Sequence, residues 1–499
     1  MQEREAKLAV PVGFELPELG GADDGFLAEP QAPKRMRTTY YDTPDLRLAR
    51  WGASLRHRPG EGWTVKLPVG QEGALLVRGE HVFPGDGRKP PEEAVDLVRA
   101  FVRSGQLSPV VRMRTLRRPV ELRDQAGAPL AELVDDQVQV LDGNRISSRF
   151  REIEVELAEG ETADALERVL ERVLERLRQA GAEAADPTPK YLRALAGRDG
   201  QLGPELAQPE LDPHASVEAL LRHDLAAGTM RLFRHEAAVR IGEDPEAVHQ
   251  ARVATRRLRS TLRTFRRLLE PEWTARLRDE LKWLADLLGA VRDADVLLAR
   301  FHGHLAALPE ADAKAGQRLL KSLVERREAD RGRLLGAMGE PRYTTLLDDL
   351  VAAAAAPALL PGADQPADEA MPPLVAKPWR QLRKTVRSAG PDPADEELHQ
   401  IRIRAKRVRY AAEAVEPVIG KPAERFADAA ADLQDVLGDQ HDAVVGETWL
   451  REAARSARRD EALVAGLLVA AERASAAASR GAWRSVWQAL DKKKLRAWF

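Results

Sequence analysis

The sequence predicts an α+β, multidomain protein in which an N-terminal antiparallel β-barrel, with flanking helices, precedes a C-terminal all-α region. Residues 1 to about 160 contain short runs of alternating polar and apolar residues punctuated by Gly and Pro, which is typical of strands. From residue 214 onward the apolar residues recur with the helical period, and Ala, Leu, Arg and Glu dominate, as in helical bundles. Two motifs of the helical region occur twice in the same order, which indicates a duplicated bundle.

Length and composition limit the possible functions. The 499 residues are 44% apolar, enough for two to four units at roughly 100 to 200 residues per domain. The formal charge is only -2 although 31% of residues are charged, so any basic surface must arise by segregating charge. Cysteine is absent, which leaves carboxylates and imidazoles as the available metal ligands. The N-terminus offers no apolar signal segment and no run of about 18 apolar residues follows, so we expect a cytoplasmic protein without a membrane partner.

Eight strands and two helices are predicted in the N-terminal region. We expect strands at Glu3–Val10, Arg35–Asp42, Ala53–Pro59, Trp63–Pro68, Leu75–Phe83, Pro109–Leu122, Ala128–Leu141 and Arg149–Leu157. Helices are expected at Pro91–Ser104 and Thr162–Ala180, the second with Thr162 as its cap.

The change of period sets the expected domain boundaries. Residues 1–197 should form the barrel domain, residues 198–213, which contain Gly, Pro and polar side chains, a linker, and residues 214–495 the helical domain. Ala353–Pro378 is rich in Ala, Pro and Asp, so we expect it to loop out between two helical repeats, about 214–352 and 378–495.

Charged residues alternate along several of the predicted strands, which gives each strand one charged and one apolar face. Acidic residues are frequent at both ends of the barrel region, and basic residues lie between them: Glu3, Glu5 and Lys7; Arg56 and Arg58; Lys66; Arg112 and Arg114; Glu152, Glu154 and Glu156. Any single strand of this kind is also typical of the solvent-facing side of a sheet. Several such strands together favour a barrel with a polar lumen.

Such a lumen suits phosphoryl chemistry. A hard divalent cation with oxygen ligands keeps mutually repelling carboxylates ionised, and it bridges to substrate phosphates. Arg and Lys would hold the polyanion while the metal polarises the phosphoryl oxygens.

Two helices carry a basic stripe at matching positions. His249, Arg252, Arg256 and Arg259 have the spacing i, i+3, i+7 and i+10, and His399, Arg402, Lys406 and Arg409 repeat it 150 positions later. A following Leu-Gly-x-x-x-Asp segment also recurs, with Asp293 and Asp442 as its acidic members. Stacked cations repel one another, so each stripe needs acidic neighbours or a polyanion opposite.

The stripes leave alternatives open. An isolated stripe is more often a solvated Arg face balanced by neighbouring acids, and a histidine at a helix start is often satisfied by backbone. The duplication favours two stripes that line a common groove, and phosphate favours the charged form of histidine. Nucleic-acid sites usually interleave aromatic residues for base stacking, whereas these stripes contain none and only 5% of the chain is aromatic. A polyanion without bases fits better.

The helical half resembles the CHAD family, named for its conserved histidines, on the repeated His-x-x-Arg-x-x-x-Arg/Lys helices and the Leu-Gly-x-x-x-Asp segments. The resemblance covers about residues 214–495 and implies two four-helix bundles that bind inorganic polyphosphate. It also implies phosphate contacts from His249, Arg252, Arg256, His399, Arg402 and Lys406. Arg259 and Arg409 join this set from the spacing alone, whereas Asp293 and Asp442 are expected to pair with the cations.

The N-terminal half resembles the CYTH, or triphosphate tunnel metalloenzyme, family over about residues 1–195. The resemblance rests on Glu-x-Glu-x-Lys at the start, Tyr40-Tyr-Asp-Thr-Pro44, Leu55-Arg-His-Arg58, the Glu-x-Glu-x-Glu run and Pro189-Lys-Tyr-Leu192, in that order. It implies a metal set of Glu3, Glu5, Glu152 and Glu154. The implied phosphate set is Lys7, Arg56, Arg58, Lys66, Arg112, Arg114 and Lys190. Glu132 is a further candidate, and the roles of Arg117 and Arg118 stay open.

Together the two resemblances make inorganic triphosphate or short polyphosphate the expected substrate. We expect hydrolysis of tripolyphosphate to pyrophosphate and phosphate with Mg²⁺ or Mn²⁺ as cofactor, and polyphosphate binding by the helical domain. The expected catalytic residues are Glu3, Glu5, Lys7 and Lys66. The alternatives are a non-catalytic polyphosphate-binding adaptor, an enzyme acting on thiamine triphosphate or ATP, and a nucleic-acid module. No specific nucleic acid is expected, and no protein partner is predicted.

Overall fold

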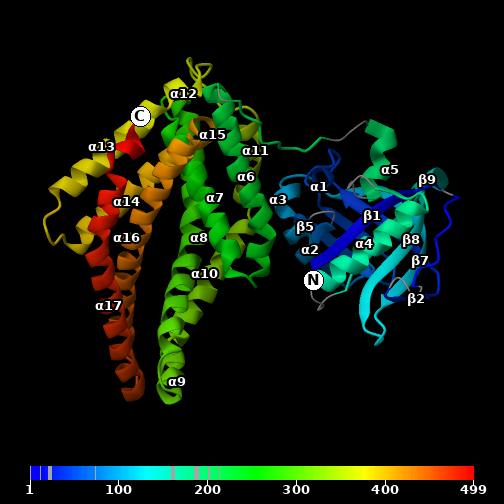
Figure 1. Ribbon diagram of the computed structural model, residues 1–499, viewed down its shortest axis with the longest axis horizontal. Helices are drawn as coiled ribbons and strands as arrows, with labels where there is room; N and C mark the ends of the chain where they lie inside the picture. Colours follow the sequence, from blue (N-terminus) through cyan, green and yellow to red (C-terminus); the bar gives the residue numbers. More distant parts are fainter. Residues whose placement is uncertain are drawn as a thin grey trace. The chain divides into compact units, whose positions relative to one another are not determined.

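The computed structural model describes residues 2–11, 13–20, 25–72, 75–158, 163–184, 190–199, 203–212 and 214–499, except for some side chains at element ends, Glu3 among them (Figure 1). The chain divides into two compact units, Met1–Glu205 and Leu206–Phe499. The first is built around a barrel and the second is helical, which confirms the predicted fold class.

Among the described residues, eight strands close an antiparallel barrel. In spatial order they are β1 (Gln2–Val10), β6 (Leu75–Phe83), β5 (Gly62–Glu72), β4 (Ser54–Arg58), β3 (Lys34–Asp42), β7 (Ser108–Arg123), β8 (Pro129–Asp142) and β9 (Arg145–Leu157), and β9 pairs with β1. Two shorter strands, β2 (Leu27–Pro30) and β10 (Glu183–Ala184), extend β7 and β1. Each of the eight predicted strands is present, with ends that differ by a few residues.

One outer face of the barrel is covered by α4 (Ala163–Gln179). The apolar residues that alternate along β1, β8 and β9 point outward there, and Leu8, Leu133 and Val155 pack with Val173 and Leu177 of the helix. This helix is the one predicted over 162–180; its expected cap, Thr162, lies outside the described residues.

One end of the barrel interior is filled by α5 (Lys190–Asp199). Tyr191 stacks on Tyr40 with ring centroids 4.9 Å apart, and its hydroxyl donates a hydrogen bond of 2.6 Å to the Ala53 carbonyl. Val111 and Met113 of β7 pack into the same apolar cluster. The predicted linker was placed from residue 198, whereas α5 continues to Asp199.

The Tyr-Tyr-Asp-Thr-Pro motif supports the fold. The fully buried carboxylate of Asp42 accepts hydrogen bonds from the backbone N–H groups of Thr43, Leu48 and Ala49, and so holds the short helix α1 (Arg47–Arg50). Burial raises the pKa of Asp42 to about 6, and the hydrogen bonds, which favour the charged form, offset only part of this rise.

The single helix predicted over 91–104 is two short helices, α2 (Glu92–Leu97) and α3 (Arg99–Val102). Val98, between them, has φ -105° and ψ 4°, outside the helical region.

The second unit contains the following helices among its described residues. They are α6 (Val217–Ile241), α7 (Pro245–Thr264), α8 (Pro271–Leu305), α9 (Glu310–Leu319), α10 (Lys321–Gly339), α11 (Pro341–Ala355), α12 (Ala367–Ala370), α13 (Pro372–Ser388), α14 (Asp395–Glu413), α15 (Glu416–Ile419), α16 (Lys421–Ala453) and α17 (Arg459–Leu490), followed by a 3₁₀ turn at Lys493–Arg496.

The segment 353–378 was expected to loop out, and this expectation is wrong for its second half. It contains α12 and the first turns of α13, with Pro378 inside the helix. A proline there removes one backbone hydrogen bond. The buried apolar stripe of Val375, Trp379 and Leu382 holds the helix against its neighbours despite that loss.

The duplication is visible in the packing. Helix α6 packs on α7 and α7 on α8, while α13 packs on α14 and α14 on α16, and the two central helices α7 and α14 contact each other (Figure 1). Corresponding positions of α7 and α14 differ by 150, as His249 and His399 do.

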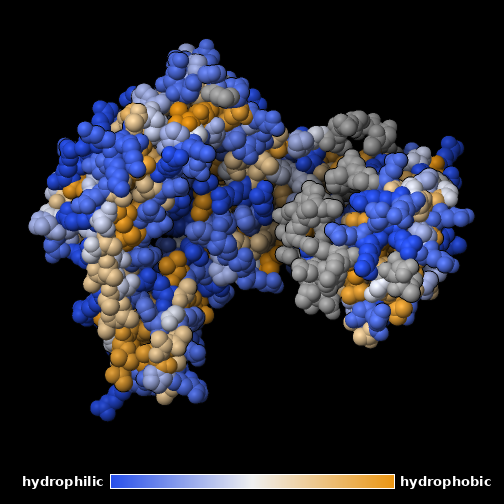
Figure 2. All heavy atoms as spheres, viewed as in Figure 1, coloured by the Kyte–Doolittle hydropathy of each residue, from blue (hydrophilic) through white to orange (hydrophobic). Residues whose placement is uncertain are grey.

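One described helix, α17, is long and apolar enough to cross a membrane by length and composition alone. Apolar residues gather along it, where Leu463 and Leu467 are exposed (Figure 2). It also packs on α16, and its fully buried Glu472 pairs with Arg300 and His304 of α8.

Candidate functional site

A polar cavity of about 260 Å³ lies inside the barrel. It is lined by side chains from all eight barrel strands, β1 and β3 to β9, and from α5. Its cations are Lys7, Arg56, Arg58, Lys66, Arg78, Arg117 and Lys190, and its carboxylates are Glu61, Glu80, Glu154 and Glu156. The alternation along each strand therefore places the charges inside, as predicted for this end of the barrel.

Lys7 lies between two glutamates. Its Nζ is 2.8 Å from Glu154 and 3.2 Å from Glu5, and Arg78 lies 3.6 Å from the same oxygen of Glu5. Burial alone would lower the pKa of Lys7, but Glu154 and Glu5 raise it above its ordinary value. Lys7 therefore stays charged in the cavity.

A second acidic group neutralises the β4 and β5 cations. Glu80 lies 3.0 Å from Lys66 and 3.6 Å from Arg56. Burial raises the pKa of Glu80, but Lys66 and Arg56 lower it below its usual range. Burial and the neighbouring Arg56 lower the pKa of Arg58.

Lys190, at the start of α5, lies among three carboxylates. Its Nζ is 3.0 Å from both Glu152 and Glu154, and it also pairs with Asp136. Arg117 lies 2.7 Å from Asp136. Burial opposes ionisation of Asp136, yet Lys190 and Arg117 lower its pKa to about 2.

Two predicted phosphate residues do not face the cavity. Arg112 and Arg114 are exposed, whereas Val111, Met113 and Thr115 point inward. The inward-facing arginine of β7 is Arg117, whose role was left open. The expectation failed because the barrel interior is apolar at the end that α5 fills, so that the charged face of β7 is the outer face there.

The predicted metal set is only partly gathered. Glu5 and Glu154 lie at the cavity, but Glu152 is buried against Lys190 and Arg193, and the side chain of Glu3 lies outside the described residues. Arg118 pairs with Asp135 on the outer side, at 3.5 Å.

The strand register suggests a different acidic set. Glu5 of β1 pairs with Glu156 of β9, and Glu156 pairs with Glu132 of β8, so three carboxylates follow one another across the sheet. Oxygen donors of this kind suit a hard divalent cation. Within the described residues, no three His, Asp or Glu side chains converge on one point in this conformation. The set thus matches a metal site in donor chemistry and strand register, but not in the positions of its side chains.

Sequence reasoning missed Arg78, Glu80 and Asp136. Arg78 and Glu80 have the same i, i+2 spacing on β6 as the pairs that were recognised. Asp136 follows Val134 on the inward face of β8, but its neighbour Asp135 conceals the alternation.

In the helical unit, the two basic stripes meet at the contact of α7 and α14. Arg252, Arg256, Arg402 and Lys406 act on one another electrostatically and form a central cluster. Burial and the three neighbouring arginines lower the pKa of Lys406 to about 7. The cluster thus concentrates positive charge at the contact of the two helices.

Acidic neighbours compensate the stripes only partly. Arg252 lies 3.7 Å from Asp293, as expected, and Asp442 acts on Arg402 without a close ion pair in the described structure. Arg409 pairs with Glu413 at 2.6 Å, and Arg259 lies near Asp286 and Asp279, so these two residues belong less closely to the central cluster.

One histidine of the stripes, His249, is less readily charged than expected. Burial, then Arg292, lowers the pKa of His249. His399 stacks on His441 with ring centroids 4.4 Å apart, and burial together with Arg402 lowers the pKa of His441 to about 4. His441, which sequence reasoning missed, precedes Asp442 in the repeated segment.

The barrel with its charged cavity defines a domain of the triphosphate-tunnel type. The duplicated bundle with its paired basic helices defines a helical domain of the phosphate-binding type. The CYTH domain model matches residues 1–192 and the CHAD domain model residues 223–451. The chain belongs to the family of CYTH–CHAD proteins. CYTH enzymes generally use divalent metal ions, and the family includes hydrolases and cyclases.

Similar proteins include the uncharacterized protein Rv2226 of Mycobacterium tuberculosis, which is 32% identical over 99% of this chain and 97% of its own length. Among solved structures, PptA from Streptomyces chartreusis is 26% identical, with a TM-score of 0.47, over 55% of this chain and all of that chain. The CHAD domain from the plant Ricinus communis is 28% identical, with a TM-score of 0.46, over 57% of this chain and 94% of that chain.

Proposed function

We propose that the barrel hydrolyses inorganic triphosphate to pyrophosphate and phosphate with Mg²⁺ or Mn²⁺, and that the helical unit binds inorganic polyphosphate. The observation that carries the first part is the cavity, in which seven cations and four carboxylates face one enclosed space. A site that only bound a polyanion would need the cations but not the carboxylates.

The cations would bind and orient the substrate. Lys7, Lys66 and Arg117 reach the cavity from different strands, so they can contact phosphoryl oxygens from several sides and neutralise charge that develops on the terminal group. Water then bonds to the terminal phosphorus while the bond from that phosphorus to the bridging oxygen of pyrophosphate breaks. Their present acidic partners, Glu154, Glu80 and Asp136, hold these side chains in place before substrate binds.

Glu5, Glu156 and Glu132 would hold the metal. A divalent ion bound there would supply electrostatic stabilisation of the phosphoryl oxygens.

Inorganic triphosphate is favoured over an organic one because the cavity offers no free stacking surface among its described residues. Its two tyrosines, Tyr40 and Tyr191, stack on each other and are buried. Phosphate release from tripolyphosphate, ATP and thiamine triphosphate would separate these substrates.

The test measures phosphate release from tripolyphosphate with and without Mg²⁺ or Mn²⁺. Glu5→Gln should lower turnover by about 100-fold or more and leave polyphosphate binding by the full chain intact. Absence of metal-dependent release from the wild-type chain would contradict the proposal and favour the adaptor.

A matched pair on β7 tests the placement of the cations. Arg117→Ala should lower kcat/KM for tripolyphosphate by about 10-fold to 100-fold, because its guanidinium faces the cavity. Arg114→Ala, three positions away and exposed, should behave as wild type. Equal losses in the two variants would show that the inner face of β7 has been misassigned.

A further inference from the structure

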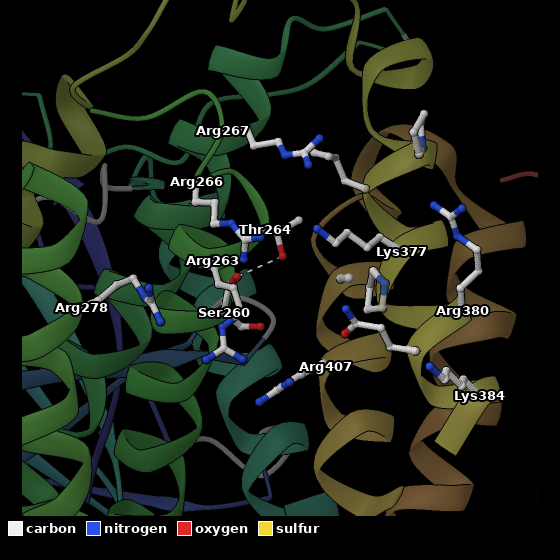
Figure 3. A pocket seen from close by; sticks show the side chains of 15 residues that line it. Ser260, Arg263, Thr264, Arg266, Arg267, Arg278, Lys377, Arg380, Lys384 and Arg407 are labelled. Carbon is white, nitrogen blue, oxygen red and sulfur yellow. Dashed lines mark hydrogen bonds between the residues drawn. The ribbon is translucent and has the colours of Figure 1, made fainter. Parts of the chain in front are cut away.

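A large groove in the helical unit lies outside the predicted stripe residues. It has a volume of about 1000 Å³ and is formed by the C-terminal end of α7, the turn that follows it, α8, α13 and α14. Eight of its fifteen lining residues are Lys or Arg, and none is acidic. Figure 3 shows Arg263, Arg266 and Arg267 reaching from the α7 side toward the space that Lys377 enters from α13.

The duplication supplies a second groove as an internal comparison. It has a volume of about 550 Å³ and is formed by α6, α7 and α14. Eleven of its fifteen lining residues stand 150 positions from a residue that lines the first groove. Arg234 corresponds to Lys384, and Arg257 to Arg407, so the two grooves are the same feature of the two repeats.

Charge distinguishes the two grooves. The smaller one contains the carboxylates Asp224, Glu246 and Glu413, and Arg257 lies 3.3 Å from Glu413. In the larger groove, Leu374 stands in the place of Asp224, and Arg263 in the place of Glu413. Lys377 and Arg380 similarly replace Ala227 and Met230. The larger groove therefore has an apolar residue and a cation where the smaller groove has the acids Asp224 and Glu413.

The basic groove has no internal counter-charge. Within the described part of the chain, none of its eight cations forms an ion pair with a carboxylate. Burial lowers the pKa of Arg263, and the nearby Arg407, Arg278, Arg259 and Arg266 lower it further. Like charges held this close destabilise the free protein unless an anion is bound between them.

The lining also indicates which anion fits. Ser260 occupies the position at which Tyr410 lines the other groove, so the basic groove contains no aromatic residue for base stacking. Its guanidinium and ammonium groups are spread along a groove large enough for several phosphate units.

We propose that this one-sided groove is a second phosphate-chain site, which holds a stretch of linear polyphosphate beside the central cluster of α7 and α14, whereas the equivalent groove of the other repeat holds none. This inference rests on the proposed polyphosphate binding by the helical unit. It adds the position of a second binding site and a difference in binding between the two repeats.

The experiment compares two matched double variants of the full chain for binding of polyphosphate of defined length, by calorimetry. Lys384→Ala/Arg407→Ala removes two cations of the basic groove, and Arg234→Ala/Arg257→Ala removes the equivalent cations of the neutralised groove. The first should weaken binding about tenfold. It should also lower the slope of log Kd against log salt concentration by roughly 0.7 to 0.9 per cation removed, the value for nucleic-acid phosphates. The second should leave affinity and slope unchanged.

Arg263→Glu gives a readout that a loss of folding cannot mimic. It introduces the residue type that the other repeat carries at Glu413, so it should raise the Tm of the free protein by relieving repulsion and, at the same time, weaken polyphosphate binding. Thermal unfolding of each variant without ligand checks that the chain is folded.

Each outcome has one meaning. Equal weakening by the two double variants, or no weakening by either, overturns the one-sided site. If Arg252→Ala/Arg402→Ala abolishes binding in that case, the proposed function stands without this inference. If the wild-type chain binds no polyphosphate, both fail. The last control is single-stranded RNA of equal charge. If it binds as tightly as polyphosphate and Lys384→Ala/Arg407→Ala abolishes its binding, the groove is a nucleic-acid site and the assignment is overturned.

Discussion

At the scale of single residues, the glycine of the first Leu-Gly-x-x-x-Asp segment, Gly289, explains how Arg252 of the basic stripe packs. A Cβ atom at Gly289 would lie 2.4 Å from Nη1 of Arg252, which is closer than real contacts allow, whereas one at Gly438 would lie 3.7 Å from Nε of Arg402. The guanidinium of Arg252 therefore occupies the space that the missing side chain leaves on α8.

Gly289→Ala should displace that guanidinium. We expect polyphosphate binding to weaken by roughly threefold to tenfold, as for the loss of one phosphate contact. Stability should be unchanged or should rise by up to about 1 kcal/mol, because alanine favours a helix more than glycine does. Gly438→Ala is the matched control and should bind as wild type. A Gly289→Ala protein with wild-type affinity would show that Arg252 contributes nothing.

Lys406 makes polyphosphate binding depend on pH. Its pKa of about 7 in the free protein rises when phosphate is bound, because the anion favours the ammonium form. Binding then takes up a proton above pH 7, and affinity should fall as pH rises, by at most about tenfold per pH unit for one proton. Calorimetry in buffers of different ionisation enthalpy counts this proton.

Lys406→Arg keeps its charge at these pH values and should remove the uptake. The same shift has the opposite sign for stability: between pH 7 and the ordinary pKa of lysine, the unfolded chain binds more protons, so this residue's contribution to the unfolding free energy rises with pH. Uptake of a proton by the Lys406→Arg variant would assign the titration to another group.

At the scale of elements, the strands of the barrel were largely predictable, because alternation and Gly or Pro boundaries are local features of the sequence. Which side chains of a strand point into the barrel was predictable only where the barrel interior is polar. At the end that α5 fills, Val111 and Met113 face inward, so the charged residues of β7 change sides along one strand, between Arg114 and Arg117. Only the docking of a helix 70 or more positions away in the sequence decides this, and the local pattern cannot contain it.

The first turns of α13 were concealed by prolines, which ordinarily indicate a break. The segment Ala353–Pro378 was expected to loop out because it is rich in Ala, Pro and Asp, so only the first turns of α13, before the predicted repeat at 378–495, were missed. Those turns contribute Leu374 and Lys377 to the basic groove.

Glu472 joins α17 to α8. It is fully buried and pairs with Arg300 at 2.5 Å and with His304 at 3.2 Å. Glu472→Ala leaves Arg300 without its carboxylate, so we expect the free energy of unfolding to fall by about 3 kcal/mol, as measured by urea denaturation. Glu447→Ala on α16 removes ion pairs to the exposed Arg451 and Arg473 and should cost less than about 1 kcal/mol. Similar losses for both would mean that the buried pair contributes little.

At the scale of the whole molecule, the two units should separate the two activities. Glu205 ends the first unit, where it accepts a hydrogen bond of 2.6 Å from Trp51 and pairs with Arg103. A fragment of residues 1–205 should therefore fold and hydrolyse tripolyphosphate with metal, and a fragment of residues 206–499 should bind polyphosphate without hydrolysing it. An inactive but folded 1–205 fragment, beside an active full chain, would show that the helices complete the active unit.

The duplication of the helical unit has a consequence for a ligand without direction. The two ends of linear polyphosphate are chemically identical, so the paired stripes of α7 and α14 would bind the chain in either orientation. Because acidic residues line only the smaller groove, the two sides of the central cluster are not equivalent for the bound chain. A polyphosphate chain longer than the central cluster would then extend into the basic groove and not into the neutralised one. A duplicated fold would in this way bind a symmetric polymer in one direction.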